Sequence, residues 1–412
     1  MEISRKWWMM LACEIMLIAT SSASFIGDWI SAMVSDTPNR IALPLNGNVY
    51  PNGYYNVTLY VGQPGRPYFL DIDTGSDLTW LQCDAPCVEC TQTPHPLYYP
   101  SNSRVPCKDP LCASMQPSEE YICQSPDQCD YEVHYADGGS SLGVLLNDAF
   151  LFNSTKGKRL NPLLALGCGY DQLPGPGGSS HPIDGILGLG KGKTSITSQL
   201  SEQGLTRNVV GHCLSSRGGG FLFFGDGFFD PSRVTWRPMS PDQPRHYSPG
   251  LAELYLGTKP TGIRNMQVAV DSGSSYTYLN SVAYLAFISL VKEDLLGKPL
   301  REDPNDRSLP VCWRGRRPFT SVREVRKYFR SWGLSFTGGA RGKGTQFQFH
   351  PEDYLIVSFK GNVCLGVLNG TEVGLGRLNV IGDISMQDKM LIYDNDNNRI
   401  GWTIANCNRI PK

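Results

Sequence analysis

Two copies of a short acidic motif contain the residues most able to do chemistry in this 412-residue chain. Residues 69–80 (FLDIDTGSDLTW) match residues 267–278 (QVAVDSGSSYTY), and each copy places an aspartate, Asp73 or Asp271, at the end of an apolar strand. Two carboxyl groups brought into contact cannot both ionise at low cost, so such a pair holds one shared proton. The pair could then act as base and acid at once, activating a water for attack on a carbonyl carbon. This chemistry requires no metal and no cofactor, and we expect neither.

The residues after each aspartate have the properties that would position it. A hydroxyl residue comes first and could lock the two loops together through bonds to backbone, and a glycine follows that permits close approach of the chain. A serine at the fourth position could support the carboxylate. The supporting residues predicted in this way are Thr74, Gly75, Ser76, Ser272, Gly273 and Ser274.

The rest of the sequence repeats on the same period. Ile183–Leu189 (IDGILGL) and Leu378–Asp383 (LNVIGD) share an apolar-apolar-Gly strand end, and each lies at nearly the same distance after its aspartate. Duplication at one spacing indicates two homologous lobes. We expect an N-terminal lobe over 48–235 and a C-terminal lobe over 236–412, because prolines cluster near Pro231–Pro244.

Composition favours a mostly β fold. The chain has 44 Gly and 29 Pro, and apolar runs are short and broken by turn residues. Its net charge of −1 lacks the basic excess that favours nucleic acid as a partner. The predicted fold is therefore all-β and bilobal with a few covering helices. Strands are predicted around Tyr54–Val61, Tyr68–Ile72, Gly143–Phe152, Phe221–Phe224 and Leu391–Tyr393, and helices over Thr194–Leu205, Val282–Leu296 and Val322–Phe329.

The cysteines and the N-terminus indicate an oxidising compartment. Residues 1–24 have the layout of a secretory signal peptide, although Glu14 interrupts the apolar run and an uncleaved anchor or a buried helix is the alternative. Residues 25–47 form a short segment before the first lobe, and no later stretch is long and apolar enough to span a membrane. Twelve cysteines then remain as disulfide candidates: Cys83, Cys87, Cys90, Cys107, Cys112, Cys123, Cys129, Cys168, Cys213, Cys312, Cys364 and Cys407.

Two features of this region have alternative interpretations. The spacing of Cys83, Cys87 and Cys90 would also suit zinc, but an even number of cysteines behind a signal peptide favours disulfides. Three sequons predict glycosylation in the secretory route, at Asn56, Asn153 and Asn369. For Asn56 the alternative is a strand asparagine that faces solvent.

Taken together, the motifs resemble the pepsin-like aspartic proteases, and within them the plant nepenthesin-like and nucellin-like branch. The resemblance covers roughly residues 48–410. This family provides the standard example of the shared-proton aspartate pair. By resemblance, residues 131–145 form a flap over the substrate, and residues 83–129 form the Cys-rich insertion of the branch. The flap and cleft residues implied in this way are Tyr135, Trp80, Asp137 and Gly138.

The resemblance also implies an activity and a setting. It implies an endopeptidase that acts at acidic pH on peptide or protein substrates, as a monomer secreted to the apoplast or the vacuole. The habit of the family's C-terminal lobe pairs Cys312 with Cys364. Catalytically dead xylanase inhibitors share this fold and give a rival function, but both aspartates and Tyr135 are retained here. A Cys-rich adhesion module would leave the duplicated loops unexplained.

Four further sequence features depart from this pattern or remain ambiguous. Asp71 adds a carboxylate on the same strand face as Asp73, so it either raises the pKa of the pair or makes a hydrogen bond at the strand end. Residues 25–47 contain no lysine-rich inhibitory segment. Gly188–Gly192 is interpreted as a turn rather than a phosphate loop. The basic run is interpreted as a solvated face, with a role in substrate choice as the alternative: Arg314, Arg316, Arg317, Arg323, Arg326, Lys327 and Arg330.

Overall fold

The computed structural model describes residues 39–85, 87–100, 102–115, 123, 126–173, 175, 182–336 and 345–411. The predicted signal peptide at 1–24 and much of the segment at 25–47 lie outside these residues. The described chain is built mainly from β-strands, as predicted, with few helices. All descriptions below concern this part of the chain.

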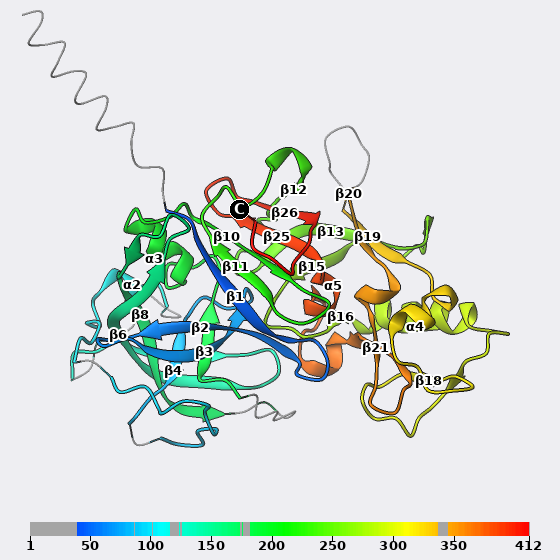
Figure 1. Ribbon diagram of the computed structural model, residues 1–412, viewed down its shortest axis with the longest axis horizontal. Helices are drawn as coiled ribbons and strands as arrows, with labels where there is room; N and C mark the ends of the chain where they lie inside the picture. Colours follow the sequence, from blue (N-terminus) through cyan, green and yellow to red (C-terminus); the bar gives the residue numbers. More distant parts are fainter. Residues whose placement is uncertain are drawn as a thin grey trace, which may run out of the picture. The chain divides into compact units, whose positions relative to one another are not determined.

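A 14-stranded sheet forms the largest layer of the molecule (Figure 1). In spatial order its strands are β12 (Thr235–Pro238), β26 (Arg399–Ile404), β25 (Lys389–Asp394), β10 (Val209–Leu214), β11 (Gly220–Phe224), β1 (Ile41–Asn48), β2 (Tyr54–Val61), β3 (Arg66–Asp73), β9 (Gly185–Gly188), β4 (Trp80–Gln82), β8 (Leu163–Leu173), β6 (Ser140–Asn153) and β5 (Asp130–His134), with β7 (Arg159–Leu160) beside β6.

Two smaller sheets complete the β structure. The 8-stranded sheet contains β20 (Thr345–Phe349), β19 (Trp332–Phe336), β13 (Tyr247–Leu256), β15 (Met266–Val270), β24 (Asn379–Ile381), β16 (Thr277–Leu279) and β23 (Val367–Asn369), with β14 (Lys259–Pro260) beside β13. The 4-stranded sheet contains β17 (Arg301–Glu302), β18 (Cys312–Arg314), β22 (Val363–Leu365) and β21 (Leu355–Val357).

The strand arrangement repeats the duplication seen in the sequence. In the large sheet β3 is parallel to β9, β9 antiparallel to β4, and β4 parallel to β8. In the 8-stranded sheet β15, β24, β16 and β23 follow with the same directions. The bilobal β fold is therefore observed, with an equivalent four-strand motif in each half.

The two halves are also joined through one sheet. The C-terminal strands β25 and β26, red in Figure 1, lie beside the green strands β10 and β12 from the middle of the chain. The disulfide Cys213–Cys407 links β10 to the chain after β26. A division of the sequence into two separate lobes does not predict this shared sheet, because the pairing joins segments far apart in the chain.

Short helices cover the sheets, and one of the three predicted helices is wrong. The helices are α2 (Pro110–Ala113), α3 (Ile196–Glu202), α4 (Ser281–Asp294) and α5 (Asp383–Met386), and the 3-10 turns are η1 (Pro231–Arg233), η2 (Val322–Glu324), η3 (Arg326–Tyr328), η4 (Pro351–Asp353) and η5 (Gly370–Val373). Ser195 caps α3 and Asn280 caps α4. The helix predicted over Val322–Phe329 is instead η2 and η3. The backbone bonds of this segment reach three residues back, from Val325 N to Val322 O and from Phe329 N to Arg326 O, as in a 3-10 helix.

All twelve predicted cysteines form disulfides, so the zinc interpretation of the Cys83 cluster is wrong. The pairs are Cys83–Cys168, Cys87–Cys90, Cys107–Cys123, Cys112–Cys129, Cys213–Cys407 and Cys312–Cys364. The pairing of Cys312 with Cys364, implied by the resemblance, is confirmed. The one cluster of metal-ligating residue types found in the described chain contains these two sulfurs and Asp306. Because the sulfurs are bonded to each other, they offer no thiolate.

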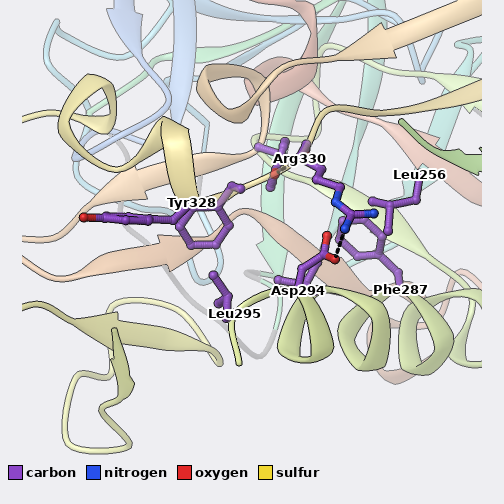
Figure 2. Close-up of a pocket in the computed structure, with 9 residues that line it drawn as sticks. Leu256, Phe287, Asp294, Leu295, Tyr328 and Arg330 are labelled. Carbon is purple, nitrogen blue, oxygen red and sulfur yellow. Dashed lines mark hydrogen bonds and ion pairs between the residues drawn. The ribbon is translucent and has the colours of Figure 1, made fainter. Parts of the chain in front are cut away.

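The long helix α4 packs against the chain segment before β19, and a small hollow lies between them. Figure 2 shows Phe287, Asp294 and Leu295 projecting from the helix toward Tyr328 and Arg330. An ion pair of 3.0 Å between Arg330 and Asp294 closes one side, and the remaining lining is mostly apolar. This hollow is a packing feature of the C-terminal half, and neither paired motif contributes to its lining.

Candidate active site

Parallel strand pairs place the two aspartates at equivalent strand ends. Asp73 is the last residue of β3 and lies opposite Gly188 of β9, and its carbonyl accepts a bond of 2.8 Å from Leu189 N. Asp271 directly follows β15, and its amide donates to Ile381 O over 3.1 Å. The apolar-apolar-Gly echoes of the sequence are thus the strands that flank the two acidic loops.

Glycine is required where each flanking strand passes its loop. A Cβ on Gly188 would lie 2.3 Å from the carbonyl oxygen of Asp77, and a Cβ on Gly382 only 2.0 Å from that of Tyr276. No side chain fits at such distances without moving backbone. The repeated glycine therefore reflects close packing of backbone beneath each aspartate.

The acidic loops face each other so closely that each glycine touches the opposite aspartate. A Cβ on Gly75 would lie 2.6 Å from Asp271 Oδ1, and a Cβ on Gly273 would lie 2.5 Å from Asp73 Oδ1. The Asp271 carboxyl group lies close enough to raise the pKa of Asp73. This is the proximity that a shared proton requires.

Reciprocal hydroxyl-to-backbone bonds hold the loops in register. Thr74 Oγ1 accepts from Ser272 N over 2.9 Å and donates to Val270 O over 3.5 Å. Ser272 Oγ accepts from Thr74 N over 3.2 Å and donates to Ile72 O over 2.8 Å. Both hydroxyls are buried, so each loop depends on the other for its hydrogen bonds.

Each carboxylate also receives bonds from its own loop. Gly75 N donates to Asp73 Oδ1 over 2.8 Å, and Ser76 Oγ donates to Asp73 Oδ2. In the other loop Gly273 N donates to Asp271 Oδ1 over 2.9 Å, and the Ser274 hydroxyl donates to Oδ2 over 2.8 Å. The six loop residues predicted from sequence are therefore all brought to the pair.

Burial and repulsion favour a retained proton at this site. Burial raises the pKa of Asp73, the Asp271 carboxylate raises it further, and the bonds from Ser76 and Gly75 oppose the shift. Two more carboxyl groups lie close by. Burial raises the pKa of Asp71 and of Asp383 well above the usual range, and the carboxylates of Asp73 and Asp271 add to both shifts.

The predicted flap is a β-hairpin made of β5 and the start of β6. Its turn is closed by Tyr135 N, which donates to Gly139 O over 2.8 Å, and Gly138 adopts the left-handed region at φ 85°. Asp137 is exposed at the turn and accepts from Gly139 N. The indole Nε1 of Trp80 donates to Tyr135 Oη over 2.6 Å, so the predicted flap tyrosine and tryptophan meet.

A cleft of about 540 Å³ connects these elements. Its lining contains both aspartates, Trp80 and flap residues, together with residues from each half of the chain. Sequence reasoning missed several of these: Gln82, Thr91, Gln172, His246 and Tyr278 line the cleft, and Asp383 lies close to the pair. Asp383 could have been found from the IGD end of its repeat, whereas Thr91 is fixed by its bonds to Gln82, which no local pattern predicts.

The glycosylation candidates differ in exposure. Asn153 is exposed at the end of β6, and Asn369 is half-buried, with its side chain bonded to Ser281, Thr371 and Glu372. Asn56 is only 6% exposed within β2. The glycosylation predicted there is therefore wrong, because the folded sheet leaves no room for a glycan. The solvent-facing alternative for Asn56 is wrong as well, since this strand position is covered.

The glycine-rich turn and the basic run lie outside the catalytic loops. Gly190 N donates to Ser76 O and Gly192 N to Asp77 Oδ1, so these amides are occupied by the protein and lead into α3. In the basic run Arg317, Arg326 and Arg330 pair with Glu324, Glu352 and Asp294. No member of the run lines the described cleft.

Comparison with known proteins places this geometry in a family. The family models described as xylanase inhibitor N-terminal and C-terminal match residues 55–226 and 254–403. An aspartic proteinase of Oryza sativa subsp. japonica is 44% identical over 386 residues, covering 91% of this chain and 93% of the relative. The chain belongs to the pepsin-like aspartic proteases of plants. The chain is a protease, like its relatives named aspartic proteinases, and it retains both aspartates of the pair.

More distant comparisons agree on the fold. Aspartic proteinase nepenthesin-2 of Nepenthes gracilis is 27% identical and covers 86% of this protease and 78% of the relative. The crystal structure of basic 7S globulin from soybean superposes with a TM-score of 0.68 at 16% identity, covering 91% of this chain and 99% of that one. Across the described residues, no helix of the protease is long and apolar enough to cross a membrane.

Proposed function

We propose that this protease is an endopeptidase that cuts an extended peptide in the cleft, using a water activated between Asp73 and Asp271. The observation that carries the proposal is the mutual contact of the two loops, in which each glycine touches the opposite aspartate. Equivalent strand ends, reciprocal hydroxyl bonds and the pKa of Asp73, which burial and the neighbouring Asp271 carboxylate raise, support it.

The pair acts through its single shared proton. The ionised carboxylate removes a proton from the bound water, and the water oxygen attacks the peptide carbonyl carbon. The protonated carboxyl group donates to the carbonyl oxygen and stabilises the charge that develops there. The tetrahedral intermediate then collapses as the amine leaves with a proton from the pair. Ser76 and Ser274 hold the carboxylates in place during both steps.

The flap supplies the other wall of the cleft. Tyr135 is half-buried, and its bond from Trp80 fixes the phenol over the catalytic side of the cleft. Burial, together with the Asp73 carboxylate, raises the pKa of Tyr135 well above its usual range, so the phenol stays protonated. We assign to the flap the exclusion of water and the binding of the substrate backbone.

Synthesis through the secretory route and action at acidic pH complete the proposal. Six disulfides support an oxidising compartment, and Asn153 remains an exposed glycosylation candidate. Activity requires that the pair hold one proton, so it should be lost when that proton leaves at higher pH. We propose the apoplast or the vacuole as the compartment.

The test is cleavage of a denatured protein substrate from about pH 3 to about pH 7, with and without pepstatin. We expect acid-side cleavage that pepstatin blocks and that Asp73→Asn and Asp271→Asn both abolish. Protein that is oxidised and glycosylated but cleaves nothing at any pH would contradict the proposal. Inhibition of a xylanase by that same protein would then favour the inhibitor function that the family models name.

A further inference from the structure

The floor of the cleft carries a carboxyl group that the proposed mechanism does not use. Asp71 lies on β3 two residues before Asp73 and lines the same cleft. Strand alternation puts both side chains on one face, about 7 Å apart along the strand. Asp71 is therefore close enough to meet substrate next to the reacting bond.

One oxygen of this carboxyl group lacks a donor. Asp71 Oδ1 is buried and accepts no hydrogen bond from any described residue. The strand-end hydrogen bond considered from sequence is thus not made by this atom. A buried acceptor without a partner is costly and calls for an explanation. The Asp71 residue as a whole is partly exposed and lines the cleft, so a donor on the substrate can approach its carboxyl group from that side.

The charged groups of the cleft favour a positively charged substrate. Four of its lining residues are acidic, namely Asp71, Asp73, Asp137 and Asp271. The lining residues that can carry positive charge are two histidines, His134 and His246. His246 lies near Asp271, Asp77 and Lys191, and burial lowers its pKa, which disfavours its charged form. Carboxyl groups outnumber the side chains that can carry positive charge, and this balance favours cationic ligands once the carboxyl groups ionise.

We propose that the cleft selects peptides carrying a lysine or arginine side chain that binds Asp71, within two residues of the cleaved bond. This rests on the proposed endopeptidase function. An extended peptide advances about 3.3 Å per residue. The spacing of about 7 Å between Asp71 and Asp73 therefore corresponds to about two residues of substrate. Lysine and arginine have long apolar stems that follow the cleft wall and a charged end that supplies several donors.

The groups around Asp71 define how the selection depends on pH. The carboxyl groups of Asp73, Asp271 and Asp383 face it, Tyr54 lies near on β2, and the backbone amides of Tyr55 and Ile72 favour its ionised form. In acid Asp71 holds a proton, so a bound ammonium must displace that proton. The preference for a cation should therefore increase as pH rises from the acid range toward neutral.

A rival arrangement satisfies the same atom from within the protein. Asn56 lies directly opposite Asp71 across β2 and β3, and its buried Oδ1 also has no donor. A protonated Asp71 could donate to that oxygen and stay neutral. Such a pair would give no preference between charged and uncharged side chains, and the experiment separates the two arrangements.

The experiment uses quenched fluorescent peptides that differ at one position, with lysine or its uncharged analogue norleucine. Each position within two residues of the cleaved bond is substituted in turn. The full-length wild type should cleave the lysine peptide at least ~10-fold faster in kcat/KM at one position, as expected for a charge-assisted hydrogen bond. Asp71→Asn should bring that ratio close to one. Asp242→Asn, which removes an exposed carboxylate that does not line the described cleft, should retain the preference.

Two results would overturn the proposal while leaving the endopeptidase intact. One is wild-type cleavage with equal rates for both peptides at every position. The other is a preference that persists in Asp71→Asn, with a shifted pH profile as the variant's main effect. That second result would make Asp71 a group that tunes the catalytic pair.

A binding measurement keeps the proposal testable if no peptide is cleaved. The catalytically blocked Asp271→Asn variant is titrated with the labelled lysine and norleucine peptides, alone and with Asp71→Asn added. Tighter binding of the lysine peptide that disappears in the double variant supports the selection even where the proposed function fails. Equal affinities for the two peptides contradict it.

Discussion

The two halves of the site share their backbone pattern and differ in their charged neighbours. Asp73 and Asp271 lie at the ends of equivalent strands, and the strand that flanks each one ends at a glycine or directly before one. Two residues before Asp73 the chain has Asp71, whereas the equivalent position before Asp271 is Ala269. Directly after the flanking glycines the second half carries the extra carboxyl group, because Asp383 stands where the first half has Leu189.

Each half thus adds one extra carboxyl group, at a different position. The shared geometry depends on strand ends, glycines and hydroxyl bonds, and neighbouring positions can vary without disturbing it. The result is a symmetric pair in an asymmetric environment, with Asp73 at 6% exposure and Asp271 half-buried. Geometry is duplicated in this protein, and electrostatics is not.

The largest expected effect tests whether both aspartates of the symmetric pair are needed for catalysis. Asp73→Asn and Asp271→Asn should each reduce kcat/KM by roughly 1,000-fold or more, because either change removes the shared proton relay. The two losses should be similar despite the different burial of the aspartates. Peptide hydrolysis measured at the pH optimum of the wild type checks this.

Thermal unfolding of both variants provides the control, since Asn keeps the shape of the side chain and should leave the fold intact. If one variant retains most of its activity, the two aspartates do not catalyse the reaction as a pair. A single carboxyl group would then have to hold the proton together with a group other than the second aspartate.

The next effect concerns the asymmetric part and is read from stability. Burial, followed by the carboxylates of Asp71, Asp271 and Asp73, raises the pKa of Asp383 well above its usual range. The folded state therefore keeps a proton that the unfolded chain releases near pH ~4. The stabilisation that this proton gives the folded state is therefore fully present below that pH. As pH rises toward the folded pKa, stability falls by about 1.4 kcal/mol per pH unit.

Asp383→Asn should remove this slope, so the variant should match wild type near pH ~3 and exceed it in stability near pH ~7. Denaturant unfolding at both pH values measures the difference. Asp242→Asn, at an exposed position, is the matched control and should leave the pH dependence unchanged. An Asp383 variant that loses as much stability at pH ~7 as at pH ~3 would show that the carboxyl group serves packing instead.

The sequence was sufficient to predict the symmetric part of the site. A strand followed by Asp-Thr-Gly or Asp-Ser-Gly, repeated with a later apolar-apolar-Gly run, uses local patterns that survive in any homologous lobe. The strand predicted over Tyr54–Val61 matches β2 residue for residue. Asp73, Asp271 and their six supporting residues therefore meet in space as the duplication implied.

What the sequence could not predict depends on contacts between distant segments. The shared sheet requires β25 to pair with β10, and no local pattern encodes that partnership. The burial of Asn56 depends on what covers β2, so its sequon was misleading. The helix predicted over Val322–Phe329 failed because the segment makes bonds three residues back instead of four, a choice that the periodicity of its apolar residues does not reveal.

A smaller effect tests the bonds that join the halves. Thr74→Val removes the hydroxyl that accepts from Ser272 N, and Ser272→Ala removes the one that accepts from Thr74 N. Each variant leaves a buried amide without its partner, so each should lose about 1–3 kcal/mol of stability. Denaturant unfolding at the pH of maximum stability gives both values. A loss confined to one variant would show that the lock is supported from one side only.

The smallest effect concerns two aromatic residues at equivalent positions of the repeat, Trp80 and Tyr278. Both line the cleft, but only Trp80 donates to Tyr135 Oη among the described contacts. Trp80→Phe should therefore lower kcat/KM by about 3- to 10-fold, the cost of one lost hydrogen bond to a flap that closes on substrate. Tyr278→Phe should change it less than about 2-fold, because its hydroxyl has no corresponding partner on the flap. Equal losses in the two variants would mean that the aromatic walls act through packing alone, and that the flap bond makes no separate contribution.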